Sequence, residues 1–377
     1  MEEHPIIDRP TTIEVNLASL QHNVGQIKKH CGSDKKVMAI IKANAYGHGL
    51  IPIGVALEKM GGVDYLGVAF LEEGIALRRA NVRLPILVLG GIYKPQIGTF
   101  LDFDLELTVS SLEKLRQVEE IARAYGRPAA IHLKIDTGME RVGVHSESAG
   151  PFIAAAVNSS FCTIKGVYSH LACADDPNSP MTKLQLERFN EALSHFDRLG
   201  APMPLRHLAN SGGIINFPQT HFDMVRPGIS LYGIYPDASK KGPLDLRPIL
   251  SLKSNIVYFK VVQPNRPISY SSTWKSGHMI RVVTIPIGYG DGYRRSLSNC
   301  GEVLIGGRRY PIVGRVCMDQ FMVNIEWDSA YNGDEVVLIG KQGNEEISVD
   351  DLAQKSGTIA YEILTGLNER IPRKYIA

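Results

Sequence analysis

A lysine ends a short apolar run in Ile40-Ile41-Lys42, just before Gly47-His48-Gly49. In α/β barrels, active sites form where the strands end. Partial burial at such a place lowers the pKa of a lysine, because the charged form loses its water. The neutral amine is then available as a nucleophile or a base. Lys42 therefore indicates amine chemistry, with a lysine that only extends into water as the alternative.

Further polar residues follow later apolar runs of the same kind. They are Asp136 and Arg141, then His170, then His207, Asn210, Ser211 and Gly212-Gly213, and finally Arg226, Gly228 and Ile229. Each residue alone has an ordinary structural explanation. The ends of parallel barrel strands meet at one rim, so we expect these side chains to lie together there.

The segment Asn210-Ser211-Gly212-Gly213 has the small residues that a phosphate cradle of backbone N–H groups needs. Arg226 adds a permanent cation nearby. A lysine amine, a phosphate cradle and an arginine together suggest pyridoxal 5′-phosphate (PLP) as the cofactor. A phosphate-binding barrel without PLP is the alternative at this point.

Eight short apolar runs indicate the strands that would position these residues, since strands buried on both faces are apolar almost throughout. They are Val37–Lys42, Tyr65–Phe70, Pro85–Leu89, Leu105–Val109, Ala130–Asp136, Ile164–His170, Leu205–Ala209 and Phe222–Arg226. Helical periodicity separates them, for example in Leu17–His30, Met181–Leu199 and Ser111–Tyr125, where Ser110 or Ser111 is the expected N-cap. The alternation predicts an α/β fold with an N-terminal (β/α)8 TIM barrel; a doubly wound open sheet is the alternative.

The pattern changes at Pro236–Pro248, which has the composition of a linker. Beyond it we expect strands separated by Gly, Asn and Asp turns, and one short helix at Val349–Lys355. The predicted strands are Ile256–Val262, Met279–Ile287, Glu302–Ile305, Gln320–Ile325 and Glu335–Ile339. We therefore expect a barrel over residues 10–240 and a β-rich domain over residues 241–377, which the N-terminal strand segment 1–15 joins.

Length and composition narrow the function classes. The chain has 377 residues, enough for two domains at about 100–200 residues each. Its 41 basic and 39 acidic residues give no reason to expect nucleic acid as a partner. Five cysteines without a C-x-x-C pair argue against a disulfide framework and a Cys-rich metal site, and we expect no metal. Met1–His4 is acidic and no long apolar run exists, so we expect a cytoplasmic protein without signal peptide or membrane contact.

Several motifs together resemble the alanine racemase family, over about residues 11 to 373. Ile41–Gly49 is similar to the PLP-lysine signature of that family. Also similar, in the same order, are Asp136-Thr137-Gly138-Met139 with Arg141, Asn210-Ser211, Met224–Ile229 and Gly314–Gln320. The resemblance implies a PLP-binding barrel, a β-rich second domain and a homodimer whose active sites are shared between subunits. It implies interconversion of L- and D-alanine, supplying D-alanine for peptidoglycan.

The resemblance also implies a role for each matching residue. Lys42 would be the Schiff-base lysine and one of two acid–base groups, and Tyr270 of the partner subunit would be the second. His170 and Arg226 would support that tyrosine, with Arg226 at the pyridine nitrogen. The other implied cofactor contacts are Tyr46, Asn210, Ser211, Gly228, Ile229 and Tyr361.

Substrate contacts follow from the same resemblance. Arg141 and the backbone N–H of Met318 would bind the amino-acid carboxylate, and Tyr289 would line the entrance. Lys134, His207 and Asp319 would support these groups from behind, and Lys134 matches a position that is carbamylated in some members.

Two departures concern the substrate pocket. Ser271 stands where familiar members have glycine, and Tyr361–Gly366 lacks their Pro-Cys pair. A broad-specificity or serine-preferring racemase of the same fold is therefore the alternative function. A PLP-dependent decarboxylase and a PLP-carrier protein are the more distant ones.

Overall fold

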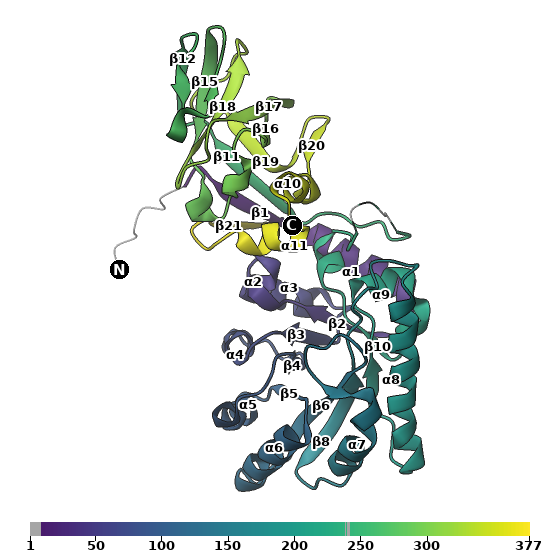
Figure 1. Ribbon diagram of the computed structural model, residues 1–377. Helices are drawn as coiled ribbons and strands as arrows, with labels where there is room; N and C mark the ends of the chain where they lie inside the picture. Colours follow the sequence, from purple (N-terminus) through teal and green to yellow (C-terminus); the bar gives the residue numbers. More distant parts are fainter. Residues whose placement is uncertain (1–8, 238, 240–241) are drawn as a thin grey trace, which may run out of the picture. The chain divides into compact units, whose positions relative to one another are not determined.

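The computed structural model describes residues 9–237, 239 and 242–377, and its chain forms two compact units (Figure 1). The barrel unit consists of residues 19–45 and 49–248, and the sheet unit of residues 9–18, 46–48 and 249–377. Residues 1–8 of the predicted segment 1–15, and residues 238, 240 and 241 of the predicted linker, lie outside the described residues.

All eight predicted strands of the barrel are present, and they are parallel. They are β2 (Lys36–Ile40), β3 (Tyr65–Val68), β4 (Ile86–Val88), β5 (Glu106–Val109), β6 (Ala129–Asp136), β8 (Cys162–Tyr168), β9 (Leu205–His207) and β10 (Met224–Val225). Their order is β10-β2-β3-β4-β5-β6-β8-β9. The N–H groups of Asp223 and Arg226 donate to the carbonyls of Arg206 and Ala209, at 3.1 and 3.0 Å, and so connect the two end strands. The barrel is nearly closed, which confirms the prediction and excludes the open sheet.

Helices cover the outside of these strands (Figure 1). They are α1 (Leu17–Cys31), α3 (Leu50–Met60), α4 (Leu71–Arg79), α5 (Ile97–Asp102), α6 (Leu112–Ala124), α7 (Ala149–Val157), α8 (Pro180–Arg198) and α9 (Ser211–Asn216). Ser111 caps α6 as predicted, because its Oγ accepts the N–H of Lys114 at 3.1 Å. Leu115, Val118 and Ala122 bury the inner face of α6. None of the described helices combines the length and the hydrophobicity needed to cross a bilayer.

The sheet unit is built on one large sheet with the order β12-β15-β18-β17-β16-β19-β11-β1-β21, and β20 pairs with β19. Its strands are β1 (Thr12–Asn16), β11 (Leu250–Asn255), β12 (Tyr258–Val262), β15 (Ile280–Ile285), β16 (Glu302–Ile305), β17 (Arg308–Val313), β18 (Phe321–Glu326), β19 (Glu335–Gln342), β20 (Glu345–Ile347) and β21 (Arg373–Ile376). The strand β1 pairs antiparallel with β11 and parallel with β21. A small ladder joins β13 (Pro267–Ile268) and β14 (Trp274–Lys275).

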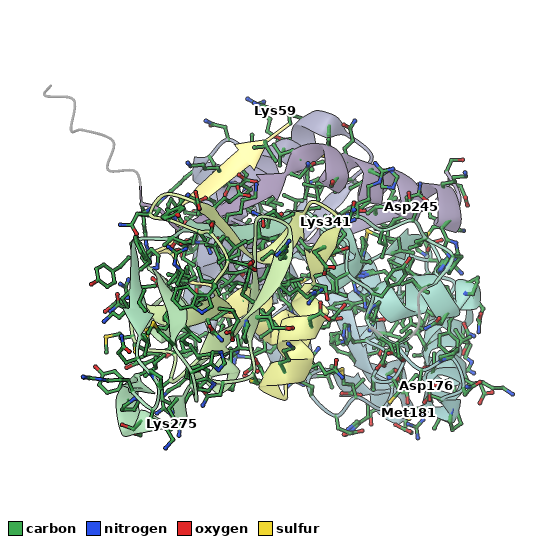
Figure 2. All side chains as sticks on the ribbon, turned by 90° about the horizontal axis from the view of Figure 1, so that it is seen from above. Lys59, Asp176, Met181, Asp245, Lys275 and Lys341 are labelled. Atoms are coloured by element: carbon green, nitrogen blue, oxygen red, sulfur yellow. The ribbon has the colours of Figure 1, made fainter. Side chains whose placement is uncertain are left out.

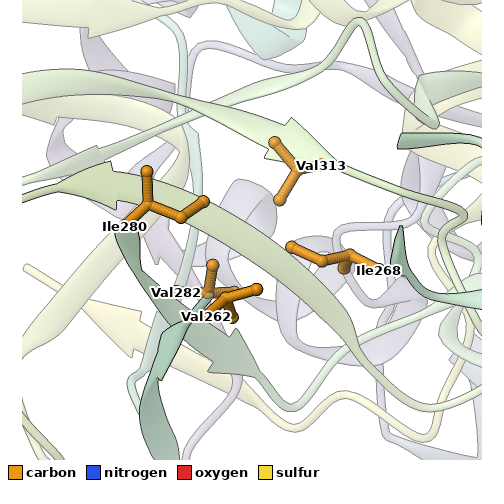
Figure 3. Packing of buried hydrophobic residues seen from close by; sticks show 5 residues of the cluster. All are labelled: Val262, Ile268, Ile280, Val282 and Val313. Carbon is orange, nitrogen blue, oxygen red and sulfur yellow. The ribbon is translucent and has the colours of Figure 1, made fainter. Parts of the chain in front are cut away.

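Alternating side chains of this sheet form its core. Val262, Ile280, Val282 and Val313 of this sheet pack with Ile268 of β13 (Figure 3), whereas the charged side chain of Lys341, labelled in Figure 2, is exposed. The predicted helix at Val349–Lys355 is α10 (Val349–Ser356), which Ser348 caps. A second helix, α11 (Ala360–Gly366), follows it, so the expectation of a single helix was wrong. Its seven residues are too few for a clear helical period.

Candidate active site

The segment that carries Lys42 turns left-handed. Ala43, Asn44, Ala45 and Tyr46 have φ angles of 53°, 54°, 51° and 52°. Such a conformation costs roughly 1–2 kcal/mol for each residue other than glycine. The expectation that the strand continues to Lys42 was therefore wrong, since β2 ends at Ile40 and the short turn α2 (Lys42–Tyr46) follows. Strain of this size persists where surrounding contacts impose it, and it is typical of functional sites.

A carboxylate from the first turn of the neighbouring helix α4 holds this turn. Glu73 accepts the N–H of Ala43 at 2.6 Å through Oε1, and the N–H of Ala69 at 2.7 Å through Oε2. On the other side, Asn44 Oδ1 accepts the N–H of Leu50 at 2.7 Å. These bonds connect the ends of β2 and β3, and so fix the backbone from which the Lys42 side chain extends.

The Lys42 side chain is half-buried and makes no hydrogen bond or ion pair with any described residue. Burial lowers its pKa, and the nearby guanidinium of Arg141 lowers it further, while Glu73 acts in the opposite direction. The neutral amine is therefore more accessible here than in an ordinary lysine.

Three further cations meet Lys42 at the strand ends. Lys134 is buried, and its Nζ lies 4.5 Å from the centre of the Tyr168 ring. Burial lowers the pKa of Lys134 well below its usual value, and Arg226 and Arg141 lower it further. Within the described part of the chain, neither the Lys134 amine nor the Arg141 guanidinium has a carboxylate partner. This face of the barrel is therefore suited to an anionic ligand.

The carboxylate nearest to these cations, Asp136, is occupied by the backbone. Its Oδ1 accepts the N–H groups of Gly138, Met139 and Glu140 at 2.8, 2.9 and 3.2 Å, and its Oδ2 accepts that of Arg141 at 3.1 Å. Burial alone would raise the pKa of Asp136, but these four bonds outweigh it and lower the pKa. Asp136 thus shapes the loop that presents Arg141 rather than neutralising the cations.

Arg226 is held by the ends of the neighbouring strands. Its Nη1 donates to the carbonyl oxygen and to Nδ1 of His207, at 2.6 and 3.0 Å. Its Nη2 donates to the carbonyls of Ser169 and Leu208 at 2.6 and 2.9 Å, and lies 3.5 Å from His170 Nδ1. Burial lowers the pKa of Arg226 to about 10, so the guanidinium stays charged at neutral pH. Its Nε–H is the one donor without a partner among the described residues.

The residues predicted to form a phosphate cradle lie together at the start of α9 and after β10. Asn210 caps α9, since its Oδ1 accepts the N–H of Gly213 at 2.9 Å. Ser211 Oγ accepts the N–H of Gly228 at 2.9 Å and the hydroxyl of Ser230 at 3.0 Å. The Ser211 hydroxyl proton has no acceptor in the described part of the chain. Together with the Lys42 amine and Arg226 Nε–H, this free donor fits PLP, which offers an aldehyde, a ring nitrogen and a phosphate.

Tyr46 and Tyr361 meet within the sheet unit. Their ring centres lie 6.0 Å apart, and burial raises the pKa of Tyr46 to about 12. Arg373 anchors this segment, because its Nη2 and Nε donate to the Gly47 carbonyl at 3.0 and 3.1 Å. The segment 46–48 is thereby fixed to the sheet unit directly after the turn that carries Lys42.

The remaining predicted residues lie on loops of the sheet unit. Tyr270 is 70% exposed and stands in a tight turn in which Ser269, Ser271 and Ser272 have φ angles of 68°, 60° and 50°. The positive φ of Ser271 is a conformation that glycine adopts without strain.

Met318 and Asp319 are exposed in a neighbouring loop. The N–H of Gly290, next to Tyr289, donates to the Met318 carbonyl at 2.8 Å. Asp319 forms an ion pair with Arg370 at 2.7 Å. Tyr289 and Met318 are thereby neighbours within the sheet unit.

Sequence reasoning missed two buried polar residues, Glu106 in β5 and His132 in β6. His132 Nδ1 lies 2.9 Å from His207 Nε2, and its Nε2 lies 2.6 Å from Glu106 Oε2. The available signal was a charged and a titratable residue inside otherwise apolar runs, since such groups are buried only with partners.

Comparison with known proteins agrees with this geometry. The family model "Alanine racemase, N-terminal domain" matches residues 15–236, and "Alanine racemase, C-terminal domain" matches residues 249–375. An alanine racemase of Halothermothrix orenii is 42% identical over 370 residues, which cover 98% of this chain and 97% of the relative.

Solved structures give the same result. Alanine racemase from Bacillus anthracis with bound L-Ala-P is 36% identical, with a TM-score of 0.92 over 98% of this chain and 96% of that one. Alanine racemase from Bartonella henselae with covalently bound pyridoxal phosphate is 27% identical, with a TM-score of 0.89 over 98% and 100%. The chain belongs to the alanine racemase family of PLP-dependent isomerases.

Proposed function

We propose that this chain interconverts L- and D-alanine through two acid–base groups, Lys42 and Tyr270 of the partner subunit. The observation that carries the proposal is the group of cations at the strand ends, among them a half-buried lysine with a lowered pKa on a strained turn. When bound, PLP withdraws electrons from the substrate Cα and makes its proton removable. Racemisation then requires groups on both faces of Cα, one to take the proton and one to return it.

Lys42 serves one face. Its lowered pKa makes the neutral amine, the form that accepts a proton, more accessible than in an ordinary lysine, and the turn held by Glu73 fixes the direction from which it acts. Arg141, on the loop shaped by Asp136, would bind the substrate carboxylate. Arg226 Nε–H would donate to the ring nitrogen of PLP. Because an arginine keeps its proton, Arg226 would leave the ring nitrogen of bound PLP unprotonated, which would favour return of the proton to Cα over its transfer elsewhere.

Tyr270 serves the opposite face in the proposal. Its exposure in the single chain, on a tight turn of the sheet unit, supports a role toward a second subunit. We therefore propose a homodimer with shared active sites, in which Met318 of the partner subunit offers its N–H to the substrate carboxylate. The proposed setting is the cytoplasm, where the product would supply peptidoglycan synthesis.

The experiment is incubation of L-alanine with enzyme and PLP in deuterium oxide. We expect loss of the Cα–H signal by NMR together with D-alanine by chiral chromatography. L-Serine and L-lysine measured alongside set the specificity. Exchange with serine in preference to alanine would instead support a serine-preferring racemase, to which Ser271 and the changed Tyr361 segment point.

Variants test the assigned roles. Lys42→Ala should lose the absorbance of covalently bound PLP. Tyr270→Phe should keep this absorbance and lose turnover, whereas Tyr258→Phe, another exposed tyrosine of the sheet unit, should do neither. Mixing the inactive Lys42→Ala and Tyr270→Phe proteins should restore activity in hybrid dimers. Normal turnover by Tyr270→Phe, or no recovery on mixing, would contradict the shared two-base site.

A further inference from the structure

A chain of hydrogen bonds crosses the barrel interior from Glu106 to Arg226; we refer to Glu106, His132, His207 and Arg226 as the histidine chain. Glu106 Oε2 lies 2.6 Å from His132 Nε2, His132 Nδ1 lies 2.9 Å from His207 Nε2, and His207 Nδ1 lies 3.0 Å from Arg226 Nη1. The four residues come from β5, β6, β9 and the end of β10, and all are buried. Two residues, His132 and His207, separate Glu106 from Arg226 along the histidine chain.

The contact with Arg226 is compatible with only one arrangement of the protons in the histidine chain. A guanidinium only donates, so His207 Nδ1 must accept and carries no proton. His207 is neutral, because burial and the Arg226 charge lower its pKa well below the usual value, and its proton therefore sits on Nε2. This proton is donated to His132 Nδ1, which leaves the His132 proton on Nε2. That proton in turn requires an acceptor, which is the Glu106 carboxylate.

The neighbours of the histidine chain do not oppose this placement of the protons on Nε2 of both rings. The Tyr168 ring stacks on His207 at 4.7 Å between centres, and its hydroxyl pairs with Thr108 at 2.8 Å. Tyr65 meets His132 edge-on at 6.1 Å. Arg78, whose charge interacts with Glu106, donates to four backbone carbonyls. Lys134, above Tyr168, adds positive charge near His207 and so disfavours a second proton on that ring.

A purely structural need would not select these residues. A barrel interior is normally filled by branched apolar side chains. Replacing a buried ionic network by apolar residues of similar volume is often neutral or stabilising. Stability therefore gives no reason for the protein to keep a carboxylate and two imidazoles in its core. A role of these groups in the geometry of Arg226 accounts for them.

We propose that Glu106 and His132 are positioning residues for Arg226. By fixing both imidazole protons on Nε2, the Glu106 carboxylate makes His207 present a lone pair to Arg226 Nη1. This holds the guanidinium so that its Nε–H stays available for the cofactor ring. The inference rests on the proposed function for the meaning of that donor, whereas the histidine chain itself is tested independently of it.

The first test uses the wild-type holoenzyme labelled with 15N in its histidines. Nitrogen–proton correlation spectra show which ring nitrogen carries the proton. We expect His132 and His207 to be neutral, with both protons on Nε2. A proton on Nδ1 of His207, or a doubly protonated ring in the pair, would overturn the proposal. This result is independent of the racemase assay, so failure of the proposed function and failure of the histidine chain are distinguished.

The second test removes the carboxylate. Glu106→Leu deletes the acceptor, and Glu106→Gln keeps the shape but adds an amide donor, so neither fixes the direction of the chain. We expect mixed proton positions on His132, a fall in kcat for alanine of about tenfold, and a KM within about twofold of wild type, because Arg226 acts on the cofactor rather than the substrate. If the leucine variant does not fold, the nearly isosteric glutamine variant gives the same comparison.

The matched control is Glu326→Gln. Glu326 Oε2 pairs with His278 Nε2 at 2.9 Å, but this His–Glu pair is exposed and belongs to the sheet unit. We expect its kcat and the spectra of His132 and His207 to match wild type. Unchanged proton positions and unchanged kcat in Glu106→Gln would overturn the proposal. So would a fall in the free energy of unfolding without a change in the spectra, because that pattern describes a merely structural glutamate.

Discussion

Replacing Ala43 with glycine should relieve the left-handed turn that carries Lys42, and so make the protein more stable and less active. Ala43 has a φ of 53° and an exposed side chain, so the change removes strain without removing packing. The relief is roughly 1–2 kcal/mol. Glycine also gains freedom in the unfolded chain, which offsets about 0.4–1 kcal/mol. The expected net effect is a rise of about 1 kcal/mol in the free energy of unfolding.

The assay is urea denaturation of Ala43→Gly beside Ala155→Gly. Ala155 lies in the right-handed helix α7 of the same barrel unit, where glycine should lower the free energy of unfolding by about 1 kcal/mol. Ala43→Val should also be destabilising, because a β-branched residue tolerates positive φ poorly. A loss of stability in Ala43→Gly equal to that of Ala155→Gly would refute the left-handed turn.

Ala43→Gly should also turn over alanine more slowly than the wild type. A glycine beside Lys42 lets the amine leave the position that Glu73 and Asn44 impose. We expect kcat to fall about tenfold with alanine as substrate. An unchanged kcat in a stabilised Ala43→Gly would show that the strained turn has no role in aiming Lys42.

Three further changes test the elements around the site. Asp136→Asn should lower the free energy of unfolding by roughly 1–3 kcal/mol at neutral pH. Because folding lowers the pKa of Asp136, the stabilisation by its carboxylate is full above the usual pKa and is lost as pH falls through the lowered value. In urea titrations at several acid pH values, the free energy of unfolding should therefore decline less with falling pH in the variant than in the wild type. Asp223→Ala should cost roughly 1–2 kcal/mol, measured in the same way, because it removes three bonds to Arg206 that join β9 to β10. Gly212→Ala should weaken PLP binding by at least about tenfold in equilibrium dialysis, since its methyl group would lie 2.6 Å from a backbone carbon, whereas Gly25→Ala meets nothing within 4 Å and should bind PLP normally.

Local patterns predicted the elements whose causes are local. The apolar run Ala130–Asp136 and the strand β6 agree closely, because burial on both faces demands continuous apolar residues. Ser111 was identified as a cap because its side chain satisfies an N–H only three residues away. The gathering of Lys42 with Arg141 and Arg226 followed from the rule that parallel strands end at the same rim.

Features imposed by distant residues could not be predicted in this way. No glycine marks positions 43 to 46, and the left-handed turn depends on Glu73, thirty residues later in the chain. The histidine chain links Glu106 to His132 and His132 to His207, at separations of 26 and 75 residues. A charged or titratable residue inside an apolar run marks a buried polar group, but a single sequence does not show which of these groups pair. The exposed position of Tyr270 likewise acquires meaning only from the motif around it.

Three carboxylates near the predicted site in the barrel unit do not pair with its cations. Glu73 and Asp136 accept hydrogen bonds from backbone N–H groups, and Glu106 pairs with His132. The amines of Lys42 and Lys134 have no anionic partner among the described residues, and the charge of Arg141 lowers the pKa of both. A ligand that brings phosphate and carboxylate groups would supply the missing anions, and binding at 100 times Kd adds about 2.7 kcal/mol to stability. The geometry is thus set by groups that never meet the ligand, and the unsatisfied charge that the folded chain retains becomes the driving force for binding it.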